Sequence, residues 1–161
     1  MPEVVVNTSP LQYLFQLQLL DLLPELYQEV LVPEGVVREV TAGLARGVSL
    51  PGLESLPWLK LRPVKNPAVL PLAAGLGIGE REVLALALEL EKPLVILDDS
   101  LARRFARRLD LPLTGTLGLL LKAKQSGRVD RVHPCLERLE VLGFRLDAST
   151  RENVLRLAEE D

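Results

Sequence analysis

Two adjacent carboxylates, Asp98 and Asp99, are the clearest candidates for chemistry in this sequence. They follow residues 94–97, an apolar run without alternation that is typical of a strand buried on both faces. In open parallel α/β sheets, ligands bind beyond the carboxyl ends of the strands. A simpler role is open as well, because a short acidic side chain at this point can cap the next helix. The functional role gains weight if other polar groups converge on the same edge.

Asn7 is a second polar group at an expected strand end, directly after the β-branched run of residues 4–6. Its side chain can form a local turn, or it can place an amide oxygen in the crevice beyond the sheet. Ser9 before Pro10 predicts the start of a helix, with Ser9 as its cap. In a parallel sheet with right-handed crossovers, this strand end would lie beside that of Asp98.

Glu39 lies in a helix that Pro33 and Glu34 are expected to open after a short strand at residues 30–32. The pattern of valines around Glu39 favours a solvent-exposed position for its side chain. The alternative is that Glu39 is a further acid at the strand ends.

Glu80 opens the helix that precedes the buried strand of residues 94–97. Glu82 follows two residues later, which is about 200° around a helix, so only one of the two can easily point into a crevice. We favour Glu80.

The remaining elements follow from turn residues and apolar spacing. Further strands are expected at residues 58–61 (a short edge strand in the Pro- and Gly-rich region 43–79) and 111–114, and further helices at 22–27, 115–127 and 135–142, with a last one that a capping box at 149–152 begins. Strands that alternate with helices predict an α/β fold, a three-layer α/β/α sandwich with a central parallel sheet.

Length and composition indicate a single domain of residues 1–161, with the C-terminal helix of residues 146–161 at its periphery. No apolar run reaches 18 residues and no basic-then-apolar leader is present, so we expect no membrane span and no signal peptide. The single Cys135 excludes an internal disulfide and fits a reducing compartment. A net charge of −3 argues against indiscriminate nucleic-acid binding but allows a local basic patch. Neither GxGxxG nor GxxxxGK[ST] occurs, which makes an unrelated nucleotide-binding fold the weakest hypothesis.

Several stretches together resemble a known family. In chain order they are VVVNTSPLQYL, VLVPEGVVREV, GEREVLALALEL, LVILDD, ARRFARRL and LPLTGTLGLLLKAKQSG. Their order resembles the PIN-domain superfamily, and more narrowly an uncharacterised prokaryotic branch close to the VapC-type toxin ribonucleases. The resemblance covers nearly the whole chain. It implies a PIN-like fold and a metal-dependent ribonuclease with a group of acids at the carboxyl edge of the sheet.

The resemblance assigns roles to individual residues. The four acidic positions of the family fall on Asn7, Glu39, Glu80 and Asp98. Supporting positions fall on Thr8, Ser9 and Asp99. The implied catalytic residues are Glu39, Glu80 and Asp98, which with Asn7 would bind Mg²⁺ or Mn²⁺, hard cations that prefer oxygen ligands. The bound metal would activate a water molecule for attack on an RNA phosphodiester.

Asn7 departs from the family pattern, because an amide oxygen carries no charge and cannot act as a base. We expect weaker metal affinity, a preference for Mn²⁺, and slow or absent cleavage. Two functions therefore stay open. One is a metal-dependent endoribonuclease that acts as the toxin of a toxin–antitoxin pair. The other is a catalytically weak or inactive PIN-like module that binds RNA or protein.

Arg103, Arg104 and Arg107 lie in the helix after Asp99 and are the candidate RNA-binding residues, although a solvated, salt-bridged face explains most of these arginines equally well. Only 4% of the residues are aromatic, so we expect recognition of RNA by backbone and shape. The partners implied are RNA, a small antitoxin protein and a second copy of the chain in a homodimer. The expected location is the cytoplasm.

Overall fold

The computed structural model describes residues 3–66 and 75–161. Its sheet has the strand order β3-β2-β1-β4-β5, and all neighbouring strands are parallel. The strands are β1 (Glu3–Val6), β2 (Glu29–Val32), β3 (Leu59–Leu61), β4 (Leu94–Ile96) and β5 (Leu113–Thr114). Val6 lies opposite Ile96, so the carboxyl ends of β1 and β4 are neighbours, as the crossover argument predicted.

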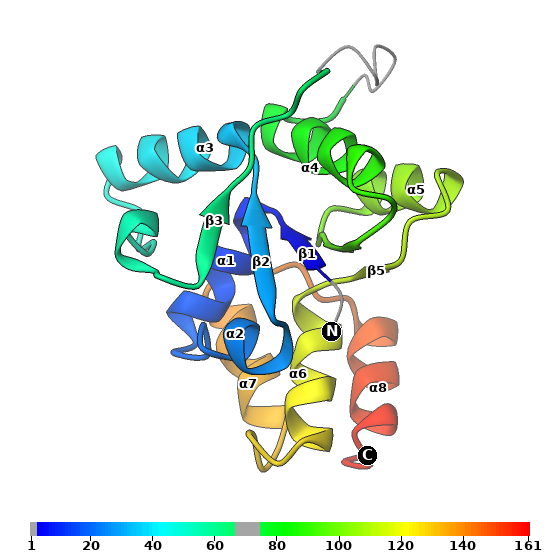
Figure 1. Cartoon of the computed structure of the whole chain (residues 1–161). Coiled ribbons are helices and arrows are strands. Elements are labelled where there is room, and N and C mark those ends of the chain that lie inside the picture. Colours follow the sequence, from blue (N-terminus) through cyan, green and yellow to red (C-terminus); the bar gives the residue numbers. More distant parts are fainter. Residues whose placement is uncertain (1–2, 67–74) are drawn as a thin grey trace.

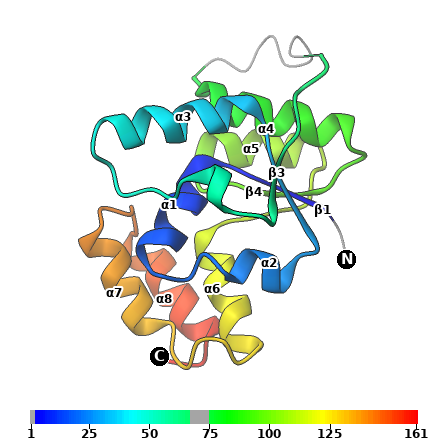
Figure 2. The ribbon, with the colours of Figure 1, turned by 60° about the vertical axis from the view of Figure 1, so that its left-hand side comes forward.

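Helices cover both faces of this sheet. They are α1 (Thr8–Gln16), α2 (Leu22–Leu26), α3 (Glu34–Ala45), the short 3₁₀ helix η1 (Leu53–Ser55), α4 (Ile78–Glu89), α5 (Ser100–Arg108), α6 (Thr116–Gln125), α7 (His133–Val141) and α8 (Ala148–Leu157). In Figures 1 and 2, α3, α4 and α5 lie on one side of the sheet, and α1, α2 and α6 lie on the other, with α7 and α8 farther out. The predicted three-layer α/β/α sandwich is confirmed.

The central strands are apolar because both of their faces are covered. The side chains of β1 from Val4 to Val6 are fully buried, as are Val95 and Ile96 of β4. A second apolar cluster joins Leu120 of α6 to residues of α7 and α8, among them Leu136 and Val154. The helices of the C-terminal part are therefore held to the sheet through α6.

Two helix starts differ from the sequence predictions. Ser9 does not cap α1, because the helix begins at Thr8 and Asn7 occupies the cap position. The Ser9 hydroxyl donates to Asp98 instead. Ser149 does not begin α8 either. The Asp147 carboxylate accepts a hydrogen bond from the N–H of Thr150 at 2.7 Å and starts the helix at Ala148, so the predicted capping box is wrong.

The Pro- and Gly-rich region of residues 43–79 contains η1 and β3, and β3 is the edge strand that its sequence predicted. Residues 67–74 of this region lie outside the described part of the chain. The start of α4 falls at Ile78, two residues before Glu80, because Gly77 takes the cap position. Among the described residues, no helix is both long enough and apolar enough to cross a lipid bilayer.

Candidate active site

Asn7 ends β1, and its backbone N–H donates to the carbonyl of Ile96 at 3.1 Å. The residue is only 4% exposed, and its side-chain Oδ1 accepts no hydrogen bond from the described residues. Gly79 lies directly against this oxygen. A Cβ atom at Gly79 would be 3.1 Å from Asn7 Oδ1 and would collide with the carboxylate of Glu39. The first turn of α4 therefore brings two oxygen-bearing side chains close together, and a larger residue at Gly79 would have to displace the Glu39 carboxylate.

Glu39 reaches the same place from α3. Thr8 Oγ1 donates to Glu39 Oε1 at 2.6 Å, and the N–H of Gly79 donates to Oε2 at 3.1 Å. The solvent-exposed position favoured by the valine pattern is wrong for Glu39. The reason is that α3 packs along α4, which brings this face of α3 to the start of α4 and to the end of β1.

Asp98 follows β4 and is held by hydroxyl and backbone donors. Its Oδ2 accepts from Ser9 Oγ at 2.9 Å and from Thr116 Oγ1 at 2.7 Å, and its Oδ1 accepts from the N–H of Thr116 at 2.7 Å. Asp99 has the structural role of a helix cap, because its carboxylate accepts a hydrogen bond from the N–H of Ala102 at 2.9 Å at the start of α5. Asp99 therefore caps a helix, whereas Asp98 binds residues of α1 and α6 from distant parts of the chain.

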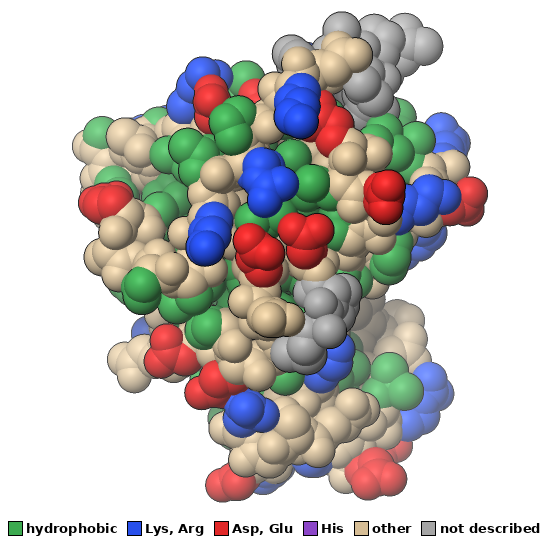
Figure 3. All heavy atoms as spheres, viewed as in Figure 1, with side chains coloured by type: hydrophobic (Ala, Val, Ile, Leu, Met, Phe, Trp, Pro, Cys, Tyr) green, Lys and Arg blue, Asp and Glu red, His purple; other side chains and the backbone are tan. Residues whose placement is uncertain are grey.

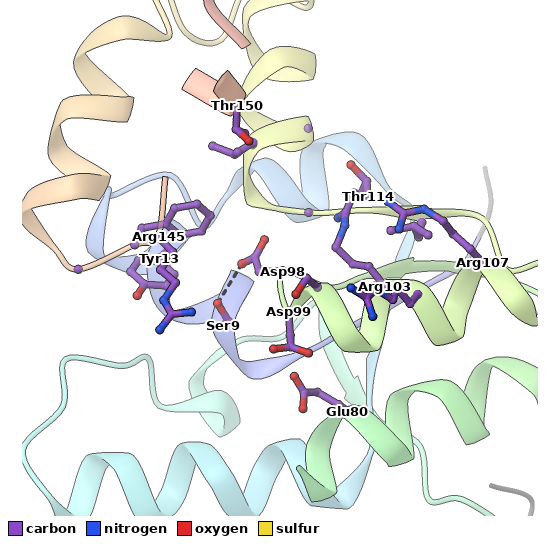
Figure 4. A pocket seen from close by; sticks show the side chains of 18 residues that line it. Ser9, Tyr13, Glu80, Asp98, Asp99, Arg103, Arg107, Thr114, Arg145 and Thr150 are labelled. Carbon is purple, nitrogen blue, oxygen red and sulfur yellow. Dashed lines mark hydrogen bonds between the residues drawn. The ribbon is translucent and has the colours of Figure 1, made fainter. Parts of the chain in front are cut away.

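Glu80 lies at the mouth of the site. Its Oε1 accepts from the N–H of Gly77 at 2.9 Å, and Figure 4 shows its carboxylate facing that of Asp99. Burial raises the pKa of Glu80, and the negative charges of Asp99 and Glu39 raise it further against the opposing effect of the Gly77 hydrogen bond. Glu82 is engaged elsewhere, with the N–H of Gly35, so Glu80 is the member of the pair that lies at the site.

A cleft of about 800 Å³ runs past Asp98 and contains Glu80 and Asp99 in its lining. Arg103, Arg104 and Arg107 of α5 line one side of it. None of the three forms an ion pair with the described residues, and Arg104 and Arg107 are exposed to solvent.

Arg103 is held in the cleft wall, because its Nη1 donates to the carbonyl of Leu97 at 2.8 Å. Burial lowers the pKa of Arg103, the charge of Arg107 lowers it further, and the charge of Asp98 opposes both effects. The α5 side of the cleft is therefore a basic wall next to an acidic centre.

Four residues at this site were not predicted from the sequence: Tyr13, Gly79, Thr116 and Arg145. Thr116 follows β5, so the rule that located Asp98 at a strand end could have located it too. Gly79 belongs to the glycine-rich stretch GLGIGE, and the sequence alone did not indicate why glycine is needed there. Arg145 lies between α7 and α8 and carried no sequence signal.

The acids do not form one compact cluster. Glu39 lies with Asn7 against the start of α4, Asp98 lies with Ser9 and Thr116, and Glu80 faces Asp99. Within residues 3–66 and 75–161, no three His, Cys, Asp or Glu side chains gather closely enough to hold a metal ion by themselves. Any cation here would need the amide oxygen of Asn7, water or substrate oxygens as further ligands.

Comparison with known proteins supports the sequence resemblance. A family model described as PIN domain matches residues 3–160. No curated protein matches the chain. PIN domains have a nuclease-like fold, commonly bind RNA and generally use divalent metal ions. Since the match covers almost every residue and the parallel sheet agrees with it, the chain belongs to the PIN-domain family.

Proposed function

We propose that this chain is a divalent-metal-dependent ribonuclease that cleaves RNA in the cleft at Asp98. The observation that carries the proposal is the unpaired oxygen of Asn7, buried beside Glu39 at the strand ends. A buried acceptor without a donor costs about 1–3 kcal/mol. A hard cation satisfies such an oxygen, whereas no described donor does.

The donor set fits Mg²⁺ or Mn²⁺. Mg²⁺ is usually held by one or two carboxylates and keeps several water molecules or phosphate oxygens as its other ligands. The residues that would hold it are Asn7, Glu39, Glu80 and Asp98. A bound ion of this kind acidifies water and neutralises charge on the scissile phosphate.

The protein groups around this centre have separate tasks. The hydrogen bonds from Ser9 and Thr116 hold Asp98 in one orientation. Burial and the charges of Asp99 and Glu39 raise the pKa of Glu80 without metal, and a bound cation would relieve this repulsion. Arg103, Arg104 and Arg107 bind phosphates of the RNA backbone along the α5 wall.

The basic wall is a local feature of the molecule. On the face shown in Figure 3, acidic and basic side chains are interspersed and no continuous basic area stands out. The net charge is −3 as well. RNA binding is therefore assigned to the cleft, and binding should weaken with salt in proportion to the few phosphates contacted there.

The biological setting follows from the resemblance to VapC-type toxins. We infer that the chain acts in the cytoplasm as an endoribonuclease toxin, that a small antitoxin protein controls it, and that it forms a homodimer. Copurification of a small protein encoded beside it would support the toxin assignment.

A second function, RNA binding with weak or no cleavage, is favoured by the same centre. Asn7 supplies no charge, and Asp98 already accepts hydrogen bonds at both of its oxygens. Both features weaken the attraction for a cation. The competing proposal is therefore a protein that has lost catalysis but still binds RNA.

The test is cleavage of a panel of structured and single-stranded RNAs in Mg²⁺ and in Mn²⁺. Wild type is compared with Asp98→Asn and Asn7→Asp, and the matched control is Asp130→Asn, which removes an exposed carboxylate outside the cleft. We expect metal-dependent cutting that Asp98→Asn reduces about a hundredfold or more and Asp130→Asn leaves unchanged. Cutting by Asn7→Asp alone would support the competing proposal. No cutting by any variant would overturn the ribonuclease proposal.

A further inference from the structure

Two of the six aromatic residues in the chain lie in the cleft. Tyr13 comes from α1 and Phe144 from the segment between α7 and α8. Their ring centroids are 5.0 Å apart and the ring planes meet at 85°, an edge-to-face pair. Both side chains are only partly buried, so aromatic surface faces the cleft.

This aromatic end lies across the acidic centre from the basic wall. Figure 4 shows Tyr13 and Arg145 on one side of Asp98 and Arg103 and Arg107 on the other. Burial raises the pKa of the Tyr13 phenol, and the charge of Asp98 raises it further. Tyr13 is therefore within electrostatic reach of the carboxylate at the centre of the cleft.

Arg145 adds an available cation to the aromatic pair. It is exposed and forms neither an ion pair nor a side-chain hydrogen bond with the described residues. Gly143, just before Phe144, has φ +96°, and a Cβ there would meet no atom within 4 Å. The cleft is therefore open at Gly143, next to Phe144 in the chain.

We propose that Tyr13, Phe144 and Arg145 form a nucleoside-phosphate subsite that binds one nucleotide of single-stranded RNA beside the bond at Asp98. The proposal rests on the proposed function for its ligand. Aromatic faces take any nucleobase by stacking, and an arginine without a partner takes a phosphate. A base inside a duplex is not available for such a contact, so the subsite selects single-stranded RNA.

The subsite changes the expected mode of recognition. The aromatic content of 4% suggested recognition by backbone and shape alone, but the fold concentrates two aromatic rings where a substrate would lie. With phosphate contacts on α5 and a nucleotide contact at Phe144, the strand would be held on both sides of Asp98.

The test measures equilibrium binding, in EDTA, of a short single-stranded RNA and of a ribose-phosphate chain of equal length that lacks bases. Wild type is compared with Phe144→Leu, Arg145→Ala and the matched control Arg138→Ala, which removes an exposed arginine of α7 outside the cleft. Thermal unfolding of each variant verifies that it is folded.

We expect Phe144→Leu to weaken binding of RNA roughly tenfold and to leave the abasic chain unaffected. Arg145→Ala should weaken both probes and lower the slope of log K against log salt by about 0.7, the value for one phosphate of a single strand. Arg138→Ala should change neither probe. Unchanged RNA binding by Phe144→Leu, or an equal loss for both probes, would overturn the subsite.

A photocrosslink on the wild-type chain tests the subsite without any variant. RNA that contains 4-thiouridine should crosslink to the peptide with Phe144 or to the peptide with Tyr13, and crosslinks confined to α5 would overturn the proposal. Neither measurement depends on cleavage. Base-dependent binding without cleavage in any metal would support the subsite and overturn the ribonuclease proposal. Cleavage without any effect of Phe144→Leu on RNA binding would support the ribonuclease proposal and overturn the subsite.

Discussion

At the carboxyl ends of β1 and β4, the side-chain oxygen atoms have opposite hydrogen-bonding environments. On the β4 side, Asp98 accepts hydrogen bonds at both oxygens from Ser9 and Thr116. On the β1 side, Asn7 is equally well placed at a strand end and is nearly as buried as Thr116, yet its Oδ1 has no donor among the described residues.

This difference shows which side is complete by itself. Hydrogen bonds to Asp98 fix a charged carboxylate in one orientation before any substrate arrives. The Asn7 side, with Glu39 against it, holds an unsatisfied acceptor whose free energy improves when a cation or a water molecule binds.

Asn7→Asp should have the largest effect. Without metal, it places a second negative charge in a buried site beside Glu39, and the free energy of unfolding should fall by about 3–5 kcal/mol. Mn²⁺ or Mg²⁺ should restore most of this loss, because the cation neutralises both carboxylates. Thermal unfolding with and without metal measures both changes.

Asn7→Leu is the matched control for that experiment. It keeps the branched arrangement of side-chain heavy atoms and removes the unpaired acceptor, so metal should not raise its melting temperature. A metal-induced stabilisation of Asn7→Leu equal to that of wild type would show that Asn7 is not a ligand.

Glu160 shows what a saturated carboxylate does away from the cleft. Its side chain is 5% exposed and accepts hydrogen bonds from Lys124 and from the N–H groups of Val132 and His133. Burial raises the pKa of Glu160, but these hydrogen bonds outweigh burial and lower it to about 2. Because the folded pKa is below the ordinary value of 4.5, this carboxylate stabilises the protein above pH 4.5 and loses that effect as the pH falls towards 2.

Glu160→Gln should therefore lower the free energy of unfolding by about 2–3 kcal/mol at neutral pH. The difference from wild type should shrink as the pH falls from 4.5 towards 2. Urea unfolding across this range measures it, with the exposed neighbour Glu159→Gln as the control. A difference that is independent of pH would mean that the carboxylate charge is not what Glu160 contributes.

Thr116→Val tests the complete side of the cleft and should cost about 1.5–2 kcal/mol, because it removes a buried hydroxyl that donates to a carboxylate. Ser9→Ala removes the other hydroxyl, which is less buried, and should cost less. In both variants Asp98 loses a hydrogen bond that orients it, so the rate of cleavage should fall even under conditions where the variant remains fully folded. Retained cleavage in the double variant would mean that Asp98 needs no positioning.

The sequence was most informative where burial sets the pattern. Residues 94–97 had to be a central strand because no polar residue interrupts them, and Asp98 then had to lie at its carboxyl end. The order of β1 and β4 followed from the handedness of crossovers. These predictions depend on the local apolar pattern and on the handedness of chain connections, and neither requires knowledge of which side chains pack together.

Prediction failed where a side chain's role depends on what packs against it. Glu39 appeared exposed on α3, because its partners Thr8 and Gly79 come from distant parts of the chain. Arg145 could not be found at all, since the position of the segment between α7 and α8 depends on the packing of those helices. The caps of α1 and α8 were predicted wrongly for a local reason. Several residues near each helix start can cap, and the backbone conformation determined which of them took the cap position.

Glu80→Gln should have the smallest effect, and of opposite sign. Burial and the charges of Asp99 and Glu39 raise the pKa of Glu80, so ionised Glu80 is unfavourable in the folded state. Glutamine keeps the hydrogen bond from the N–H of Gly77 and removes the repulsion, which should raise the free energy of unfolding by less than about 1 kcal/mol. Because the folded pKa is raised, the gain should be present above it and disappear as the pH falls and wild-type Glu80 takes up its proton. Metal should reverse the order of stability, since only the glutamate is a charged ligand, and a variant that gains stability equally with and without metal would place Glu80 outside the metal site.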